Sequence, residues 1–285
     1  MSPTLTMTIG DRHIGRVSLG GARWSITDPA DDAPAEAILE RALDAGVDLI
    51  DTARAYTTRD EESHNERLIA RVLKRRGESR VLVATKGGHF RDGDDYPIDA
   101  SPAALRRDCQ RSLDALGREA HDLYYLHHPD PRVPFEDSVG TLAELRTAGL
   151  AVRIGLCNVT VDQLRSAREI TRIDAIQNRH GVLAPADAGL LQECTDAGIA
   201  FFGYSPLAGV DLTEPGSTVL SAAALRGMQP TSILLAWLLS AGENVGVLTG
   251  ARRAATLDAS LAAAAVQLDP TEIDAIGVEL ASIAR

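Results

Sequence analysis

The sequence of 285 residues is short of basic charge, of long apolar runs and of cysteine. Its 29 basic against 40 acidic residues give a net charge of −11, which argues against nucleic acid or an anionic membrane as the partner. No apolar stretch is long enough to span a bilayer, and the first residues lack the basic and apolar segments of a signal peptide. The three cysteines, Cys109, Cys157 and Cys194, form neither a metal-ligand pattern nor a disulfide framework. We therefore expect a cytoplasmic protein with reduced thiols.

Apolar runs alternate with amphipathic segments along the whole chain. Eight apolar runs have the length of a buried strand, at residues 16–19, 47–50, 81–85, 123–126, 152–156, 175–177, 200–204 and 245–248. A hairpin is expected ahead of them over residues 5–16, and a last helix over residues 270–283 has no strand after it. Repeated strand–helix units of this length predict parallel strands. We therefore predict an α/β fold, a closed (β/α)8 TIM barrel with a short N-terminal β-hairpin and an extra C-terminal helix, as a single domain over residues 1–285.

The chain has only two lysines, Lys74 and Lys86, so arginine carries nearly all of its positive charge. Lys74 lies in a charged run and is expected to be solvated. Lys86 follows the apolar run 81–85, which is typical of a buried strand, and two glycines come after it. A lysine is a compact point charge whose pKa shifts on burial, whereas an arginine stays charged. The position therefore indicates a need for an amine; the alternative is a side chain that snorkels from the strand end to solvent.

Two other buried runs also end in an ionisable residue, Asp51 after residues 47–50 and His127 after residues 123–126. Tyr56 follows Asp51 by five positions. In a parallel barrel the C-terminal ends of all strands meet at one face, and that face carries the chemistry. Taken alone, Asp51 is equally explained as a cap of the following turn, and Tyr56 as a surface tyrosine.

The pair His127–His128 raises the question of a metal site. Consecutive residues of a strand point to opposite faces, so we do not expect the two rings to bind one ion. The sequence predicts no metal.

Several short motifs resemble the signatures of the aldo-keto reductases, in the family's order and over essentially the whole chain. They are Asp51-Thr-Ala-x-x-Tyr56, Ala84-Thr85-Lys86, Leu126-His127-x-Pro-Asp130, Ile154-Gly-Leu-Cys-Asn158, Gln177-Asn178, Phe202-Gly-Tyr-Ser-Pro-Leu207 and Thr249-Gly-Ala-Arg252. The resemblance implies that Tyr56 is the general acid in the reduction of a carbonyl, that His127 orients the substrate, and that Asp51 pairs with Lys86. It also implies that the Lys86 ammonium lowers the tyrosine pKa from its usual value of about 10.

The resemblance further implies a nicotinamide cofactor, with NADPH favoured over NADH. The residues that it places at the cofactor are Cys157, Asn158, Gln177, Tyr204, Ser205, Leu207, Gly250, Arg252 and Arg253. A thiol is a weaker hydrogen-bond partner than the serine hydroxyl that the family favours at position 157. Either of the two arginines could pair with a 2′-phosphate in bidentate fashion. The alternative is that both lie at the solvated start of a helix and bind no ligand.

The longest expected loops on the active face, residues 87–100 and 208–217, are candidates for the substrate pocket. The pocket residues proposed from the sequence are Trp24, His89, Phe90 and His128. The basic residues expected near the same face favour a polar or anionic carbonyl compound; they are Arg23, Arg54, His89, His128 and Arg132. Two other functions stay open, an alcohol or sugar dehydrogenase that runs the reaction in reverse and a cofactor-binding regulatory subunit with little turnover.

Overall fold

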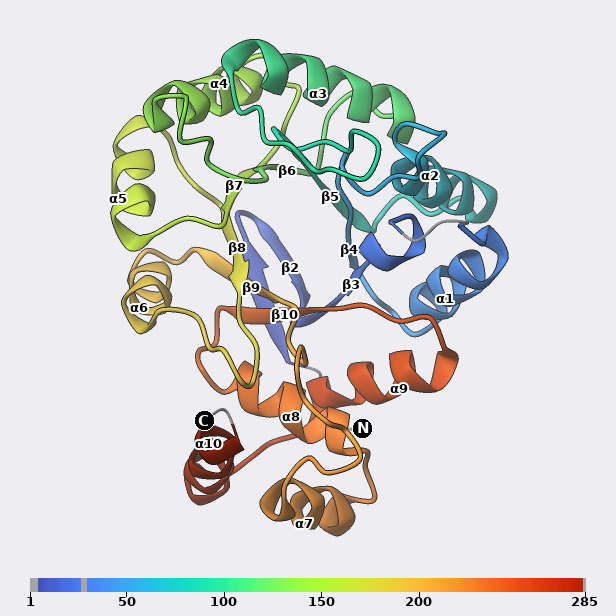
Figure 1. Cartoon of the computed structure of the whole chain (residues 1–285), viewed down its shortest axis with the longest axis vertical. Coiled ribbons are helices and arrows are strands. Elements are labelled where there is room, and N and C mark those ends of the chain that lie inside the picture. Colours follow the sequence, from blue (N-terminus) through green and yellow to red (C-terminus); the bar gives the residue numbers. More distant parts are fainter. Residues whose placement is uncertain (1–4, 27–29, 284–285) are drawn as a thin grey trace.

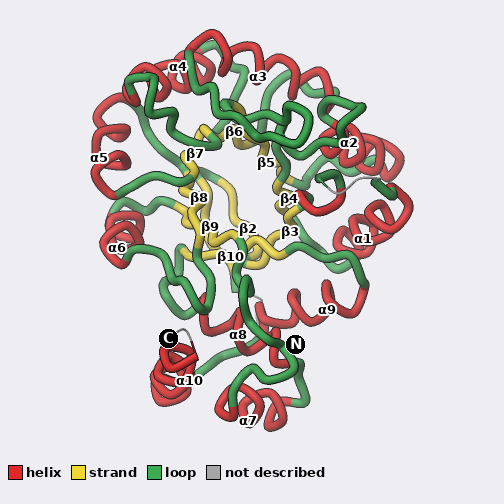
Figure 2. The backbone as a smooth tube through the Cα atoms, in the orientation of Figure 1, coloured by secondary structure: helices red, strands yellow, loops and turns green. Residues whose placement is uncertain are grey.

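The computed structural model describes residues 5–26 and 30–283, and its centre is a closed barrel of eight parallel strands in the order β10-β3-β4-β5-β6-β7-β8-β9 (Figures 1 and 2). The barrel strands are β3 (Val17–Gly20), β4 (Leu49–Asp51), β5 (Leu82–Gly87), β6 (Leu123–Leu126), β7 (Ile154–Cys157), β8 (Ala175–Arg179), β9 (Ala200–Tyr204) and β10 (Val245–Thr249). Each observed end lies within two residues of the expected one, which confirms the predicted (β/α)8 fold.

A ring of helices surrounds the barrel (Figure 1). These are α1 (Asp32–Asp44), α2 (His64–Arg76), α3 (Pro102–Leu116), α4 (Phe135–Thr147), α5 (Val161–Ile170), α6 (Ala188–Asp196), α7 (Ser217–Arg226), α8 (Pro230–Leu239), α9 (Ala254–Ala262) and α10 (Pro270–Ile283), with single 3-10 turns at Ala22–Trp24 and Ala263–Ala265. Local signals set some ends: the Ser101 side chain caps α3 by accepting from Ala104 N, and Gly117 ends it in the left-handed conformation. Sequence reasoning missed α7 and α9, which are rich in alanine and show little amphipathic alternation.

The N-terminal hairpin closes one end of the barrel. Its strands β1 (Thr6–Ile9) and β2 (Arg12–Gly15) pair antiparallel, and Figure 1 shows them across the barrel axis. Met7, Ile9 and Ile14 are buried in one apolar cluster with interior barrel residues such as Leu49 and Leu123. Because this plug fills the N-terminal end, only the C-terminal rim of the strands is left to form an open site.

The barrel interior is filled by aromatic side chains next to glycines. Tyr125 on β6 lies opposite Gly155 on β7, where an added Cβ atom would come within 2.3 Å of the tyrosine ring. Such a close approach requires glycine at position 155. Outside the barrel, α10 contacts α7, as expected for a helix with no following strand. Within the described residues, no helix has both the length and the apolar character needed to cross a bilayer.

Candidate active site

Lys86 lies fully buried on β5 at the C-terminal rim, and its ammonium is held by three oxygens. Its Nζ donates to both carboxylate oxygens of Asp51, each at 2.7 Å, and to the Thr52 carbonyl oxygen at 2.7 Å. Asp51 ends the neighbouring strand β4 and is itself buried. The side chain therefore does not snorkel to solvent, and the predicted Asp51–Lys86 pair is present.

Tyr56 and His127 complete a group of four around this ion pair. The Tyr56 hydroxyl lies 3.4 Å from Lys86 Nζ, which itself lies 4.8 Å from the centre of the phenol ring. The His127 ring meets the Tyr56 ring edge-on, with 5.7 Å between their centres. The turn after β4 positions the tyrosine, and the end of β6 positions the histidine. Side chains 76 positions apart in the sequence, from Asp51 to His127, thus form one cluster.

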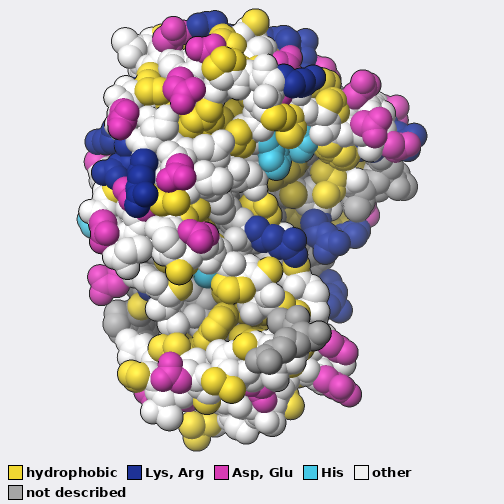
Figure 3. Space-filling view, turned by 60° about the vertical axis from the view of Figure 1, so that its left-hand side comes forward, with side chains coloured by type: hydrophobic (Ala, Val, Ile, Leu, Met, Phe, Trp, Pro, Cys, Tyr) yellow, Lys and Arg dark blue, Asp and Glu magenta, His cyan; other side chains and the backbone are white. Residues whose placement is uncertain are grey.

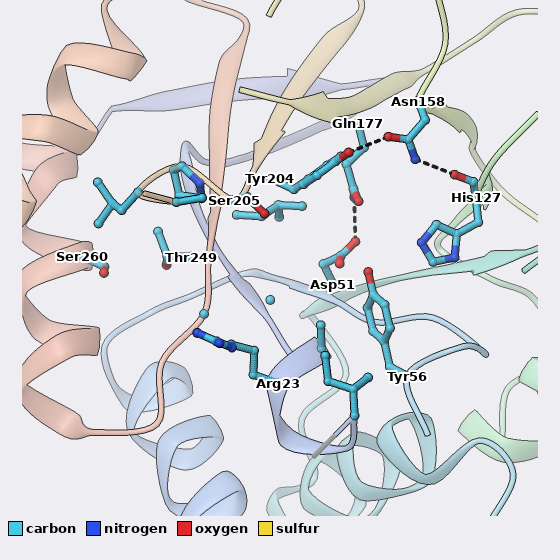
Figure 4. Close-up of a pocket in the computed structure, with 18 of the residues that line it drawn as sticks. Arg23, Asp51, Tyr56, His127, Asn158, Gln177, Tyr204, Ser205, Thr249 and Ser260 are labelled. Atoms are coloured by element: carbon cyan, nitrogen blue, oxygen red, sulfur yellow. Dashed lines mark hydrogen bonds between the residues drawn. The ribbon is translucent and has the colours of Figure 1, made fainter. Parts of the chain in front are cut away.

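Asp51 also reaches across the barrel to β8. Its Oδ1 accepts a hydrogen bond from Gln177 Nε2 at 2.7 Å, as Figure 4 shows. The carboxylate therefore has two charge-assisted partners, and these are shorter and stronger than neutral hydrogen bonds. Gln177 was expected to contact the cofactor; in this structure its amide group holds the carboxylate that holds Lys86.

The pKa values of the cluster qualify one expectation. Burial lowers the pKa of Lys86, but Asp51 and Tyr56 raise it by more, so its pKa lies above the ordinary value and the amine stays charged. Burial raises the pKa of Tyr56 to about 12, and Lys86 only partly opposes this. Lys86 therefore lowers this pKa in the predicted direction, but the net shift is upward, because desolvation of the phenolate outweighs the attraction of the ammonium.

His127 is an uncharged hydrogen-bond donor at neutral pH. Burial, followed by the charges of Lys86, His89 and His128, holds its pKa well below the ordinary value. Its backbone carbonyl accepts from Asn158 Nδ2 at 2.9 Å, and the Tyr204 hydroxyl donates to Asn158 Oδ1 at 2.7 Å (Figure 4). Asn158 has a positive φ of 59°, a conformation in which asparagine is enriched among non-glycine residues.

A cavity of about 810 Å³ opens above this cluster and extends along the rim to α9. It is lined by ten of the residues predicted from the sequence, namely Asp51, Tyr56, His127, His128, Asn158, Gln177, Tyr204, Ser205, Leu207 and Gly250. Figure 3 shows histidine side chains on a hollowed face of the molecule, with a group of basic side chains farther along the same face. The structure thus brings the catalytic candidates and most cofactor candidates to one cavity.

Seven predicted residues do not line this cavity: the fully buried Lys86, and Trp24, Cys157, Arg252, Arg253, His89 and Phe90. Trp24 is only 4% exposed, packs in the core and donates from Nε1 to the Ala251 carbonyl at 2.9 Å, so its side chain does not face this cavity. Cys157 is buried in the barrel interior, and burial raises the pKa of its thiol. Arg252 and Arg253 are exposed at the start of α9, next to the cavity wall but not part of it.

The other two pocket candidates lie on the loop after β5. Phe90 lines a separate hollow of about 410 Å³ together with Ile98 and Arg132. The loop closes on itself, because Asp99 N donates to the Gly88 carbonyl at 3.1 Å and Phe90 N donates to the Pro97 carbonyl at 3.2 Å. Its two ends therefore meet at a narrow base, while Arg91 and Ile98 within it hydrogen-bond to the turn after β4 and to the segment after β6.

His89, on the same loop, forms a cluster with His127 and His128 that the sequence did not predict. Potential metal-ligating atoms of the three rings all lie within 4.8 Å of one another. The argument that His127 and His128 point to opposite faces is wrong, because β6 ends at Leu126 and the strand alternation ends with it. The two rings instead stack with their centres 5.0 Å apart.

Arg23, Thr256 and Ser260 line the cavity but were not predicted as cofactor contacts. In Figure 4 the Arg23 side chain extends toward the side of the cavity that holds Thr249 and Ser260. Arg23 lies in the turn that follows β3, so its place after a barrel strand was a usable signal. Thr256 and Ser260 belong to α9, of which the sequence analysis considered only a start near Arg252 and Arg253, and neither residue was among the predicted cofactor contacts.

Comparisons with known proteins agree with this geometry. The sequence profile of the Aldo/keto reductase family matches residues 16–278. The chain is 31% identical over 272 residues to the uncharacterized oxidoreductase C215.11c of Schizosaccharomyces pombe, covering 92% of this chain and 86% of that protein. It is 30% identical over 274 residues to the pyridoxine 4-dehydrogenase of Escherichia coli, covering 92% and 94% respectively. The structure of the glycerol dehydrogenase AKR11B4 from Gluconobacter oxydans superposes with a TM-score of 0.84 at 22% identity, covering 98% of this chain and 95% of that one.

A parallel barrel with ionisable residues gathered at its C-terminal rim has the architecture of an enzyme. The matches identify its class as an NAD(P)H-dependent oxidoreductase that acts on carbonyl and alcohol groups. The chain belongs to the aldo/keto reductase family.

Proposed function

We propose that the protein reduces an aldehyde or ketone to an alcohol, with NADPH as hydride donor and Tyr56 as general acid. The observation that carries the proposal is the contact of the Tyr56 hydroxyl with a buried, carboxylate-paired ammonium, 3.4 Å away, at the wall of an open cavity. A carbonyl that receives a hydride at carbon develops negative charge on oxygen. A positioned phenol protonates that oxygen, and positioned acids of this kind contribute typically 10²–10⁴-fold to rate.

Lys86 acts on the proton transfer through Tyr56. Once the phenol has given up its proton, the phenolate lies beside the ammonium, and this attraction stabilises it. Asp51 keeps the amine charged and fixes its position through two 2.7 Å hydrogen bonds. Gln177 in turn fixes Asp51. Electrostatic groups held in place before the reaction need no reorganisation during it.

His127 is proposed to orient the substrate. Its depressed pKa leaves the imidazole neutral, so one ring nitrogen carries a hydrogen and can donate it to the carbonyl oxygen. A neutral donor next to the Lys86 ammonium avoids the repulsion that an imidazolium would experience. The ring lies edge-on to Tyr56, so both groups can face the same oxygen.

The cavity fits an extended nicotinamide dinucleotide. Its volume of about 810 Å³ lies within the range of ligand sites, and it runs from the catalytic cluster to the α9 residues Thr256 and Ser260. The residues proposed to hold the cofactor along this path are Asn158, Gln177, Tyr204, Ser205, Leu207, Gly250 and Arg23. When bound, the nicotinamide supplies the hydride. Cys157 is buried and is not proposed as a contact.

The preference for NADPH rests on Arg252 and Arg253. Both are exposed beside Gly250, which lines the cavity, and Arg253 is the residue directly before the first turn of α9. Arginines at a helix N-terminus attract a phosphate both by their charge and through the free backbone N–H groups. They are therefore proposed to bind the 2′-phosphate that distinguishes NADPH from NADH.

A polar small molecule is the proposed substrate, because His89 and His128 stand beside His127 at the cavity. The named relatives include a pyridoxine 4-dehydrogenase and a glycerol dehydrogenase, whose names describe the oxidation of alcohols. The second candidate is therefore the same chemistry in the oxidative direction. Initial rates in both directions with a panel of polar aldehydes, ketones, polyols and sugars separate the two directions, and turnover in either excludes a purely regulatory subunit.

Replacement of Tyr56 by phenylalanine tests the proposal. We expect kcat to fall by at least about 10²-fold, while cofactor binding, followed by fluorescence, is largely kept. Tyr96→Phe is the matched control, because Tyr96 also loses only a hydroxyl and lies on the loop outside the cluster of four. Near wild-type turnover of Tyr56→Phe on the best substrate would show that another group protonates the product.

A further inference from the structure

Three histidine rings converge at the catalytic end of the cavity. The centre of the His89 ring lies 4.7 Å from that of His127 and 4.8 Å from that of His128, and it meets both rings nearly at right angles. His127 and His128 stack with centres 5.0 Å apart. Within the described part of the chain, this is the one group of three ligating side chains close enough to share an ion.

The hydrogen bonds leave a metal-binding lone pair on His89 and on His127. Nε2 of His128 instead accepts from Asn158 Nδ2, 3.4 Å away, and an ion bound through that nitrogen displaces this contact. His89 Nε2 lies 2.9 Å from the Tyr96 carbonyl oxygen, which can only accept, so this nitrogen carries the hydrogen and Nδ1 carries the lone pair. His89 Nδ1 is buried and has no protein partner, and the same holds for His127 Nδ1. A histidine whose other nitrogen donates to a backbone carbonyl is the usual arrangement of a metal ligand.

We propose that His89, His127 and His128 form a binding site for Zn²⁺ or a similar divalent transition-metal ion, and that occupancy of this site inhibits the enzyme. Zinc binds imidazole nitrogens at about 2.0–2.1 Å in tetrahedral geometry, which places ligand nitrogens about 3.4 Å apart. The nitrogens here lie within 4.8 Å of one another, so a convergence of at most about 1.4 Å completes the site. Rotation of the side chains about χ1 and χ2 covers that distance.

The charges around the cluster permit a cation. The nearby Lys86 ammonium is balanced by Asp51 at 2.7 Å. Three ligands leave a fourth position for water, which the open cavity beside His127 and His128 can supply.

Inhibition follows because His127 would serve both as a metal ligand and as the residue that orients the substrate, and the second role rests on the proposed function. When the rings converge on an ion, His127 leaves its place beside Tyr56 and no longer donates to the carbonyl. The ion and its water also occupy the volume in front of the two residues. We therefore expect Zn²⁺ to compete with the carbonyl substrate, and a chelator to restore activity.

Direct metal binding to the whole protein tests the site without reference to activity. Titration with Zn²⁺ in competition with a chromophoric indicator should give one tight site per chain. His89→Gln and His128→Gln should each weaken Zn²⁺ binding by at least about tenfold. Mutation of a residue that only hydrogen-bonds to a metal ligand already lowers metal affinity by about 10–100-fold. His13→Gln, at an exposed histidine, is the matched control and should bind as the wild type does. Co²⁺ in place of zinc should give the visible absorption of a tetrahedral ion in the wild type and lose it in both pocket variants.

The outcomes separate this inference from the proposed function. Equal Zn²⁺ affinity in the wild type and both pocket variants, or loss in His13→Gln, overturns the metal site whatever the enzyme assays show. One-to-one binding that disappears in both pocket variants supports the site even if Tyr56→Phe remains active. Binding at this site without inhibition overturns the inhibitory role alone.

Discussion

Lys86 and Arg16 are both cations buried in the barrel, at opposite ends of it. Lys86 lies at the C-terminal end of β5 and is held by a carboxylate, one carbonyl and a phenol hydroxyl. Arg16 precedes β3 and is only 6% exposed. It donates from Nε to the Val245 carbonyl at 2.7 Å and from one terminal nitrogen to the carbonyls of Leu239 and Gly242.

The difference shows what each side chain is suited to. The planar guanidinium of Arg16 reaches several fixed carbonyls at once and ties the end of α8 and the start of β10 to β3. The compact ammonium of Lys86 fits between a carboxylate and a reacting phenol. In a chain with only two lysines, arginine serves the structural position and lysine the chemical one. This comparison predicts opposite consequences for removal of the two charges.

Lys86→Met should have the largest effect on turnover. We expect kcat to fall by at least about 10²-fold, because the phenolate of Tyr56 loses the charge that stabilises it. The variant also leaves the Asp51 carboxylate buried without its cation, which lowers the free energy of unfolding.

The double variant Asp51→Asn/Lys86→Met separates these two effects. It removes the lone carboxylate and should recover part of the stability, measured by denaturant unfolding, without recovering turnover. If the double variant regained both, Lys86 would be a structural residue, and the comparison with Arg16 would fail.

Arg16→Met should show the opposite pattern. Three buried carbonyls lose their donor, and each unsatisfied group costs about 1–3 kcal/mol unless water replaces the donor. We expect a lower melting temperature and a lower urea midpoint, with turnover per folded molecule close to that of the wild type. A stable Arg16→Met protein that has lost activity would contradict the assignment.

Arg252 and Arg253 are exposed cations, unlike Lys86 and Arg16, and they test the proposed recognition of the cofactor phosphate. Replacement of Arg252 and Arg253 by alanine should raise the Kd for NADPH by about tenfold or more and leave the Kd for NADH nearly unchanged. The NADPH preference of the wild type should weaken with salt, because exposed charge pairs are screened. Fluorescence titration of both cofactors into both proteins measures this. Equal losses for NADPH and NADH would mean that these arginines do not recognise the phosphate.

The buried His121 adds a third case to the comparison of Lys86 with Arg16. Those two side chains stay charged and are paired or hydrogen-bonded, whereas His121 is buried in its neutral form. Burial lowers the pKa of His121 to about 4, and its Nε2 lies 3.1 Å from the Cys109 carbonyl oxygen. Below pH 6.5 the unfolded chain therefore binds a proton that the folded chain does not, and the free energy of unfolding falls as the pH drops.

Between pH 6.5 and pH 5.5, His121 alone should lower the free energy of unfolding by about 1 kcal/mol. His121→Gln, which keeps a donor at the site, should flatten the pH dependence by that amount in urea unfolding at the two pH values. An unchanged slope would mean that His121 is protonated in the folded protein.

The fold was predictable because its signals are short-range and repeated. Apolar runs that end in Asp51, Lys86 and His127 mark strand ends, and parallel connections bring all such ends to one rim. Helices α7 and α9 were not predicted because both segments are rich in alanine and bury only two or three residues each, which gives little hydrophobic alternation.

The errors at the site come from three-dimensional facts that a sequence does not carry. The position of Trp24 just after β3 places it near the rim, but only packing shows that its indole turns into the core. Whether the pKa of Tyr56 rises or falls depends on two opposing effects, desolvation of the phenolate and its attraction to Lys86. The depth of burial makes desolvation the larger effect, and a sequence does not show that depth. The histidine cluster depends on where β6 ends and on how the loop carrying His89 folds over it.

The narrow base of the loop after β5 has a consequence for the evolution and redesign of the protein. Residues 88–99 begin and end at adjacent points, joined by the hydrogen bond between Asp99 and Gly88. A segment of different length and composition can be inserted between these two points without moving β5 or α3. Exchange of this loop therefore replaces the contact that His89 makes with His127, while Asp51 and Lys86 stay fixed on their strands.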